Sequence, residues 1–419
     1  MKDLATKNTK DTKKVWPKVR LGDVCKVLTD GDWIESKDQS ETGIRLIQTG
    51  NIGNGVFERK DNRARYISDA TFSKLNCTEI YSGDVLISRL PEPVGRACIV
   101  EDMGCRMITA VDCSIVRFTN EVDSRFFIQY SQSSDYQAQV SAQLTGTTRA
   151  RISRKHLSSV LIPCPPLSVQ REIVARLEKE LCEADKLAAK FKRVAELADD
   201  AFKAELDETF KALEDNSRRD AETRRVSLGD VCKVLTDGDW IESKDQSETG
   251  IRLIQTGNVG NGVFERKDNR ARYISVATFA KLNCTEIYCG DILISRLPEP
   301  VGRACIVEDV GCRMITAVDC SIVRFKDTIE PKFFIHYSQS SKYRSQISSQ
   351  LTGTTRARIS RKHLSSVLIA CPPISTQRAI IAKLDAAKER CEKLKAAAMR
   401  GLAAAENLRK AILAEAFEQ

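Results

Sequence analysis

The sequence predicts an α+β protein: two mixed α/β globular domains separated by two long antiparallel coiled-coil helices, with pseudo-two-fold symmetry. Two observations lead to this fold class. A long segment occurs twice, so that Leu21 aligns with Leu228 and every later pair is separated by the same 207 positions. Each copy is followed by a run in which apolar residues recur in alternating steps of four and three, which is the seam of a coiled coil.

The two copies of the repeat are nearly identical. The segment LTDGDWIESKDQSETGIRLIQTGN stands at 28–51 and again at 235–258. Between Leu21 and Phe118 the copies differ only at positions 52, 69, 73, 82, 85 and 103. They diverge more over 119–143, and identity returns at LTGTTRARISRKHLSSVLI. A solenoid unit has only about 20–50 residues, so the repeat is a duplicated domain.

Within one copy, short apolar runs alternate with loop signals. IRLIQ, GDVLISRL, RACIV, DCSIVRF and SVLIPCP are β-branched and flanked by Gly or Asp, which predicts strands. SDATFSKLN predicts a short helix capped by Ser68. Apolar residues at helical spacing predict one further helix from Ser124 to Leu144. Each domain is therefore mixed α and β.

Proline pairs mark the ends of the domains, because proline disrupts helix and strand interiors. Pro165-Pro166 and Pro372-Pro373 are followed by serines, Ser168 and Ser375, at the expected helix caps. The predicted organisation is a basic tail (1–20), domain 1 (21–167), a central helix (168–222), domain 2 (223–374) and a C-terminal helix (375–419). The expected seam residues are Leu177, Leu181, Ala184, Ala188, Phe191, Ala195, Ala198 and Phe202, then Leu384, Ala387, Cys391, Leu394, Ala398, Ala405, Leu408 and Ile412.

Composition and charge restrict the class of protein. No apolar run is long enough to cross a bilayer, and the basic N-terminus lacks the apolar stretch of a signal peptide, so we expect a cytoplasmic protein. The 15 cysteines are an odd number in a chain without an export signal, which favours reduced thiols. The formal net charge is +9, with clustered Arg and Lys, as expected of an anion-binding protein.

Several motifs, in order and in both halves, resemble the specificity subunit of Type I restriction-modification systems. They are WPKVRLGDVCKV and VSLGDVCKV, SGDVLISR and CGDILISR, LIPCPPLSVQREIVARLE and LIACPPISTQRAIIAKLD, and ILAEAFEQ at the C-terminus. The resemblance covers nearly the whole chain and identifies the domains as target recognition domains. It implies a non-catalytic subunit that reads a bipartite double-stranded DNA sequence, one half-site per domain.

The resemblance also implies partners. Two modification subunits would use S-adenosylmethionine to methylate adenine, and restriction subunits would use ATP and Mg²⁺ to translocate and cleave DNA. No cofactor is then expected on this chain itself. Because the two domains are nearly identical, we expect the same half-site on opposite strands, which is an interrupted palindrome, with the helix pair setting the gap.

Basic clusters are the candidates for phosphate contact, because cations bind the DNA backbone and one or two arginines can pair with guanine. The alternative is a solvated surface. The candidates are Arg59, Lys60, Arg63, Arg65, Thr147, Thr148, Arg149, Arg151, Arg154 and Lys155 in domain 1, and Arg266, Lys267, Arg270, Arg272, Thr355, Arg356, Arg358, Arg361 and Lys362 in domain 2.

The repeated polar segment is the candidate for base readout, because Gln and Asn pair with adenine, Asp accepts from cytosine and Lys reaches guanine. The alternative is that Trp33 plugs the core and that the other residues only solubilise a loop. The candidates are Asp32, Trp33, Lys37, Asp38, Gln39, Gln48, Thr49 and Asn51, and in the second copy Asp239, Trp240, Lys244, Gln246, Gln255, Thr256 and Asn258. Arg89 and its counterpart Arg296 are further candidates, with an ion pair between Arg89 and Glu92 as the alternative.

Other functions have weaker support. Glu58-Arg59-Lys60 matches part of a nuclease motif that also needs an upstream acidic residue. There is no Walker loop and no N-P-P-aromatic methyltransferase motif. Cys98, Cys105 and Cys113 lack zinc-site spacing, so we expect buried thiols and no metal. A stand-alone DNA-acting enzyme is disfavoured, and a coiled-coil scaffold that joins two protein-binding modules is the alternative function.

Overall fold

The computed structural model describes residues 16–91, 93–146, 150–217, 223–298, 300–353 and 357–417. The chain divides into two compact units. Unit 1 comprises Met1–Phe191 with Arg400–Gln419, and unit 2 comprises Lys192–Met399. Each unit therefore contains one globular domain together with segments of both long helices.

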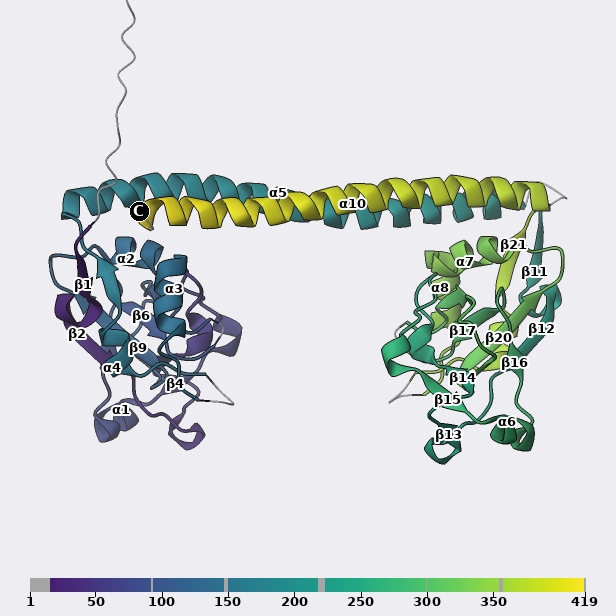
Figure 1. Ribbon diagram of the computed structural model, residues 1–419, viewed down its shortest axis with the longest axis horizontal. Helices are drawn as coiled ribbons and strands as arrows, with labels where there is room; N and C mark the ends of the chain where they lie inside the picture. Colours follow the sequence, from purple (N-terminus) through teal and green to yellow (C-terminus); the bar gives the residue numbers. More distant parts are fainter. Residues whose placement is uncertain are drawn as a thin grey trace, which may run out of the picture. The chain divides into compact units, whose positions relative to one another are not determined.

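Domain 1 is built on two four-stranded sheets and a short two-stranded ribbon (Figure 1). The first sheet has the order β2-β9-β6-β7, from Cys25–Asp30, Cys113–Phe118, Val85–Ser88 and Ala97–Ile99. The second has the order β4-β3-β8-β5, from Tyr66–Ile67, Ile44–Ile47, Met107–Thr109 and Glu79–Ile80. Strands β3 and β8 pair in parallel, and the other pairs among the described strands of domain 1 are antiparallel. The ribbon pairs β1 (Lys18–Arg20) with β10 (Leu161–Pro163).

The five strands predicted from apolar runs are confirmed as β3, β6, β7, β9 and β10. Helix α1 (Asp69–Leu75) begins after Ser68, whose hydroxyl accepts the N–H of Thr71, so the predicted cap is also confirmed. The single helix predicted from 124 to 144 is wrong. It is split into α2 (Ser124–Tyr130) and α3 (Ser134–Ser141), because Ser133 caps a new helix. A short helix, α4 (Arg154–Ser158), precedes β10.

Domain 2 repeats this arrangement. Its sheets are β12-β20-β17-β18, β13-β15-β14-β19-β16 and the ribbon β11-β21. The strands are β11 (Arg224–Ser227), β12 (Cys232–Asp237), β13 (Gln246–Ser247), β14 (Ile251–Ile254), β15 (Arg272–Ile274), β16 (Glu286–Ile287), β17 (Ile292–Ser295), β18 (Ala304–Ile306), β19 (Met314–Thr316), β20 (Cys320–Phe325) and β21 (Leu368–Cys371). The helices are α6 (Val276–Leu282), α7 (Pro331–Gln339), α8 (Ser341–Ser348) and α9 (Arg361–Ser365).

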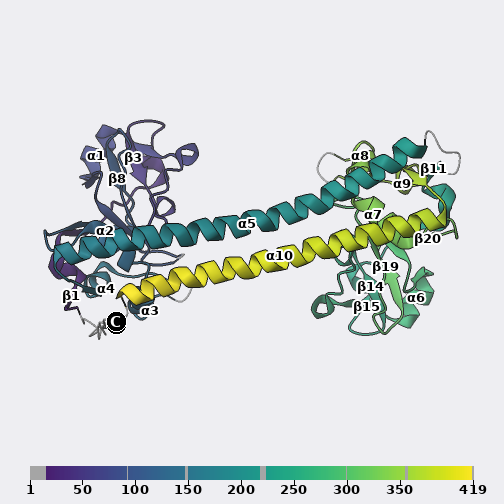
Figure 2. The same cartoon turned by 90° about the horizontal axis from the view of Figure 1, so that it is seen from above.

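The two long helices are α5 (Leu167–Ser217), with 51 residues, and α10 (Ile374–Phe417), with 44 residues. Within each unit they run side by side in opposite directions (Figure 2). In unit 1 Asp185 pairs with Arg409 at 2.8 Å, and in unit 2 Asp199 pairs with Lys395 at 2.6 Å. The antiparallel coiled coil is therefore confirmed.

Two details of the predicted helices are wrong. Ser168 and Ser375 lie inside the first turns and are not the caps, since the helices begin one residue earlier. Leu394 and Leu408 are 49% and 46% exposed, although the predicted seam would bury them. In this part of α10 the buried residues are small alanines such as Ala398 and Ala405. The buried face of the helix is therefore narrow, and Leu394 and Leu408 lie outside it.

The glycine in α10 has a packing role. An added Cβ at Gly401 would lie 2.4 Å from the ring of Phe191. The missing side chain therefore makes room for an aromatic ring of the opposing helix in unit 1.

The core of each domain extends into the end of a long helix. Phe417 of α10 packs edge-on against Phe126 and Tyr130, with ring centroids 5.5 and 5.4 Å apart. In unit 2, Phe210 of α5 packs in the same way against Phe333 and Tyr337, at 5.5 and 5.2 Å. Phe210 and Phe417 are themselves 207 positions apart, so each domain is completed by the helix of the other repeat.

Candidate nucleic-acid interface

A basic pocket forms where β3 ends and β4 begins. Two loops line it, 48–51 and 60–65, and its volume is about 260 Å³. Arg63 and Arg65 are exposed and make no ion pair with any residue in the described part of the chain. Arg59, just before the second loop, is likewise exposed and unpaired there. These three cations are available to an anion outside the protein.

Side chains inside the pocket hold its loops in place. Arg45 is buried and donates to the carbonyl of Arg59 at 2.7 Å and to Asp61 at 3.2 Å. Asn51 accepts the N–H of Gln48 at 2.9 Å and donates to the carbonyl of Glu58 at 2.7 Å. Its amide is therefore committed within the protein, which argues for a positioning role and against base contact.

Lys60 is likewise tied to the neighbouring loop. Its ammonium donates to the carbonyl of Gly50 at 2.5 Å, and its backbone has a left-handed φ of 45°. The side chain is still exposed, so the charge remains near the solvent side of the pocket. Gln48 and Thr49, between Gly50 and β3, are half-buried.

The loop before β3 carries an exposed tryptophan. Trp33 is 68% exposed, so the alternative that it plugs the core is wrong. Its indole N–H donates to Glu35 at 3.3 Å, and Glu35 pairs with Lys37 at 2.6 Å. Hydrogen bonds from Lys37 and from the indole lower the pKa of Glu35, which keeps the carboxylate charged. A planar apolar face therefore stands in solvent next to a salt-bridged pair.

Asp32 lies at the start of this loop and anchors it to neighbouring strands. Its half-buried carboxylate accepts the N–H of Thr78 at 2.8 Å, and burial raises its pKa. Its backbone joins the edge next to β8 through hydrogen bonds with Thr109 and Val111. The carboxylate thus anchors the loop that presents Trp33. Gln39, at the end of the loop, is half-buried.

Arg89 is buried and fully engaged. It pairs with Asp30 at 2.7 Å and donates to the carbonyls of Ile152 and Val111 at 3.0 and 3.3 Å. Arg89 therefore forms an ion pair, as the alternative interpretation expected, but its partner is Asp30. The expected partner, Glu92, lies outside the described residues. This burial argues against direct DNA contact by Arg89.

A second buried arginine, Arg96, holds two candidate loops together and was not singled out from the sequence. It is 8% exposed and donates to the carbonyls of Thr49 and Ile52 at 2.8 and 2.6 Å. It also donates to Leu90 and Pro93 at 3.0 and 3.1 Å. The two copies are so alike that no sequence comparison within the chain could have marked it.

The third basic cluster surrounds α4. Arg151 pairs with Asp112 at 3.0 Å. Arg154 is exposed, and its ion pair with Asp30 is long, at 4.0 Å. Lys155 is exposed and makes no ion pair with a described residue. Thr147, Thr148 and Arg149, with Thr355 and Arg356 in the second copy, lie outside the described residues.

Domain 2 reproduces nearly all of this geometry. Trp240 is 69% exposed, with its indole 3.3 Å from Glu242. Arg303 repeats the four carbonyl contacts of Arg96. One difference is that Arg266 pairs with Asp268 at 2.9 Å. The remaining counterparts lie as in domain 1: Asp239, Lys244, Gln246, Gln255, Thr256, Asn258, Lys267, Arg270, Arg272, Arg296, Arg358, Arg361 and Lys362.

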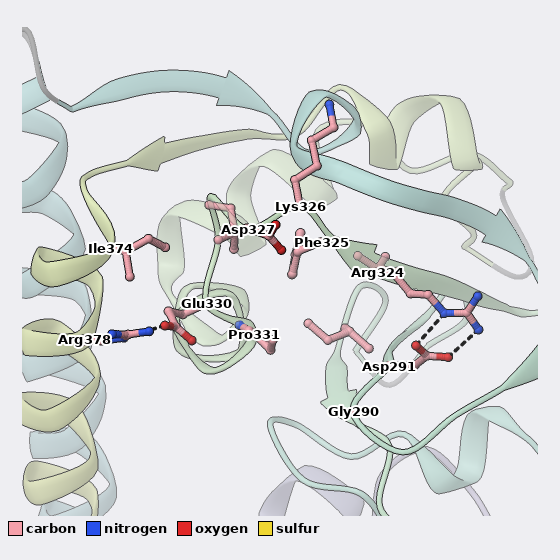
Figure 3. Close-up of a pocket in the computed structure, with 13 residues that line it drawn as sticks. Gly290, Asp291, Arg324, Phe325, Lys326, Asp327, Glu330, Pro331, Ile374 and Arg378 are labelled. Atoms are coloured by element: carbon pink, nitrogen blue, oxygen red, sulfur yellow. Dashed lines mark hydrogen bonds and ion pairs between the residues drawn. The ribbon is translucent and has the colours of Figure 1, made fainter.

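A further pocket of about 430 Å³ lies in unit 2 between β17, β20, α7 and α10 (Figure 3). Its charged walls are already paired. Asp291 accepts two hydrogen bonds from Arg324, at 2.7 and 2.8 Å, and Arg378 pairs with Glu330 at 2.7 Å (Figure 3). It is therefore a poor candidate for a charged ligand.

The described residues hold no group of three or more side chains placed to bind a metal ion. Cys98 and Cys113 are buried, as predicted, and burial raises the pKa of both thiols to about 12. Cys105 is exposed, so the prediction of a buried thiol is wrong there. Among the described helices, none is both long and apolar enough to cross a membrane.

The chain matches the family description "Type I restriction modification DNA specificity domain" twice, over residues 13–184 and 221–398. The chain belongs to this family. It is a Type I restriction-modification specificity subunit with two near-identical recognition domains.

Curated relatives in this family are distant in sequence. The chain is 22% identical to the EcoKI specificity subunit of Escherichia coli strain K12 over 393 residues, which are 89% of this chain and 82% of the relative. It is 23% identical to the EcoBI specificity subunit of Escherichia coli over 325 residues, 73% of this chain and 67% of the relative.

Solved structures share the fold. A chain from a study of complex assembly and conformational transition of the type I R-M system superposes with a TM-score of 0.74 at 22% identity, covering 96% of this chain and 97% of that one. The HsdS subunit from Thermoanaerobacter tengcongensis gives a TM-score of 0.55 at 22% identity, covering 96% of both.

Proposed function

We propose that this specificity subunit reads a bipartite DNA target, one half-site per domain, and that the two half-sites are equal. The observation that carries the proposal is the duplicated candidate surface. Arg63 and Arg270, which are exposed and form no ion pair with a described residue, occupy the same position on the two domains, as do the exposed Trp33 and Trp240. Equal surfaces recognise equal base sequences, and opposed copies of one sequence form an interrupted palindrome.

The positions of the differences between the domains support equal half-sites, because most of them, including all of those in 119–143, lie outside the candidate loops. Ile52/Val259 and Val85/Ile292 are conservative changes at buried positions. Asp69/Val276 stands at the start of α1 or α6. The carbonyl of residue 52 or 259 still accepts from Arg96 or Arg303, so the loop geometry is retained.

The base-edge contacts are assigned to the exposed part of the repeated segment. Trp33 offers an exposed planar face that can stack on a base or sugar, and the half-buried Gln39, Gln48 and Thr49 lie on loops of the same repeated segment. Arg59, Arg63, Arg65, Arg154 and Lys155 neutralise phosphates, while buried Arg96 keeps the loops in position.

The same proposal includes the partners of the complex. The chain itself is non-catalytic and brings two modification subunits, with their S-adenosylmethionine, to adenines in the target. Restriction subunits with ATP and Mg²⁺ join the complex for cleavage. The helix pair sets the distance between half-sites, which lie about one turn or ~34 Å apart when read from one face of the duplex.

Selection from a randomised duplex library by the chain assembled with its modification subunit tests this proposal. The expected product is one interrupted palindrome. If removal of one heptad from each long helix leaves the gap between the half-sites unchanged, the helices do not set that gap. Absence of any DNA affinity, at low salt and with the assembly verified, would move the assignment to a scaffold that joins two protein-binding modules.

A further inference from the structure

The two domains diverge mainly at one face, and that face meets the long helices. Residues 119–143 and 326–350 contain most of the differences between the repeats. They form α2 and α3 in domain 1 and α7 and α8 in domain 2, which lie between the sheets and the helix pair (Figure 1). Divergence at this face calls for an explanation other than DNA reading.

In unit 2 the face is basic and the end of α5 is acidic. Asp207 accepts hydrogen bonds from the backbone N–H of Ser341, at 2.6 Å, and from its hydroxyl. Lys342 pairs with Glu214 at 3.2 Å. Just beside this contact, Glu205 of α5 pairs with Lys383 of α10 at 2.8 Å.

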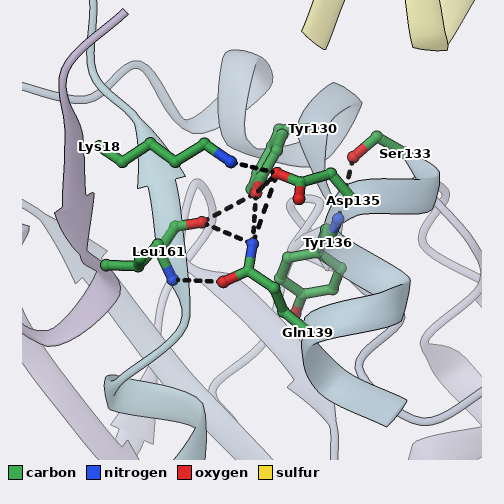
Figure 4. A network of polar contacts seen from close by, with 7 residues as sticks. All are labelled: Lys18, Tyr130, Ser133, Asp135, Tyr136, Gln139 and Leu161. Atoms are coloured by element: carbon green, nitrogen blue, oxygen red, sulfur yellow. Dashed lines mark hydrogen bonds and ion pairs between the residues drawn. The ribbon is translucent and has the colours of Figure 1, made fainter. Parts of the chain in front are cut away.

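In unit 1 the charges at the corresponding positions are reversed or absent. Asp135 stands where domain 2 has Lys342, and it pairs with Lys18 of β1 at 2.9 Å and accepts from Tyr130 at 2.8 Å (Figure 4). The position of Asp207 is occupied by Ala414, and that of Glu205 by Ile412. Here the end of α10 contributes Arg409, which donates to Gln132 and pairs with Asp185 at 2.8 Å.

The apolar part of the two contacts is the same. Phe417 and Phe210 each insert one ring between equivalent aromatic residues, at nearly equal distances. The rings alone would therefore accept either helix end on either domain. An exchanged arrangement would place Glu214 against Asp135, two like charges, and would leave Lys342 without its acid.

We infer that the charges of the divergent face match domain 2 to the acidic end of α5 and make domain 1, with Asp135 at the equivalent position, reject that helix end. The partner that it excludes is a second copy of this chain. If the end of α5 bound domain 1 of another molecule, the contact would be heterologous and could propagate into open chains. These charges favour contact between each domain and a helix end of the same molecule, and they do so independently of what the domains bind.

The test exchanges the two charges at the equivalent positions in the full-length chain, by Asp135→Lys together with Lys342→Asp. Light scattering on size-exclusion fractions, over a range of protein concentrations, should show wild-type monomers. The exchanged variant should form oligomers at about tenfold lower concentration, since each exposed pair contributes a few-fold. Lys244→Glu is the matched control, because its exposed pair with Glu242, at 2.6 Å, lies on the loop between β12 and β13 and outside the divergent face; it should stay monomeric.

A rescue arm keeps the inference testable if the exchanged variant is poorly soluble. Lys342→Glu should raise the oligomer fraction, and adding Glu214→Lys should bring it back to the wild-type value. An exchanged variant as monomeric as wild type, or a Lys342→Glu defect that Glu214→Lys does not relieve, would overturn the inference. None of these readouts involves DNA, so they stand apart from the proposed recognition function.

Discussion

Truncating Phe417 to alanine should loosen domain 1 although the residue lies on a helix of the other repeat. Phe417 is 8% exposed and contacts two aromatic rings at 5.5 and 5.4 Å. Removal of a buried phenylalanine costs about 3–5 kcal/mol. Because Phe417 is in the last described turn of α10, where a helix frays, we expect about 2–3 kcal/mol.

Hydrogen exchange of the full-length chain measures this effect locally. A loss of about 2 kcal/mol corresponds to roughly 30-fold faster exchange in α2, the helix that Phe417 covers. The matched variant Phe210→Ala, at a 2% exposed position inside α5, should instead accelerate exchange in α7, and by more. Unchanged exchange in α2, or equal acceleration in both domains, would refute the cross-repeat packing.

Three single features lead to further predictions. Gly401→Ala should destabilise unit 1 in thermal unfolding although alanine is the better helix former by about 1 kcal/mol, because its Cβ would strike Phe191; a more stable variant would contradict this packing. Arg63→Gln with Arg65→Gln should lower the slope of log K against log salt by about 0.9 for each phosphate that is no longer neutralised, measured by titration of the complex with duplex DNA; an unchanged slope would remove them from the interface. Burial lowers the pKa of His336 below 6.5 although Asp385 accepts a hydrogen bond from it, so the unfolded state binds a proton more readily and unit 2 should lose stability as pH falls below about 6.5. The variant His336→Gln, which copies Gln129 of domain 1, should abolish this loss when unfolding by denaturant is measured as a function of pH. An equal loss of stability in the variant and the wild type would refute the assignment to His336.

Much of the fold could be predicted because its signals are local. Apolar β-branched runs predicted the strands, and the serine before a helical run predicted the cap at Ser68. The break at Ser133 was missed because the apolar spacing continues across it. Leu394 and Leu408 were misplaced because heptad spacing does not show how narrow an alanine contact becomes.

The candidate site was less accessible to sequence reasoning. Exposure of Trp33 and burial of Arg89 depend on long-range contacts, since Arg89 meets Asp30 and Ile152 from distant segments. Arg96 acts through four backbone carbonyls, which carry no sequence signal. Residue type could nominate these side chains for DNA contact, but only the fold separates those that face solvent from those that hold the loops.

The central claim is that two equal domains read equal half-sites for adenine methylation. The most direct measurement is the adenine methylome, by single-molecule sequencing, of cells that co-express this chain with its modification subunit. We predict methylation at one interrupted palindrome. An asymmetric bipartite motif would contradict the equal half-sites, and the absence of any motif with a verified active partner would contradict the recognition function itself.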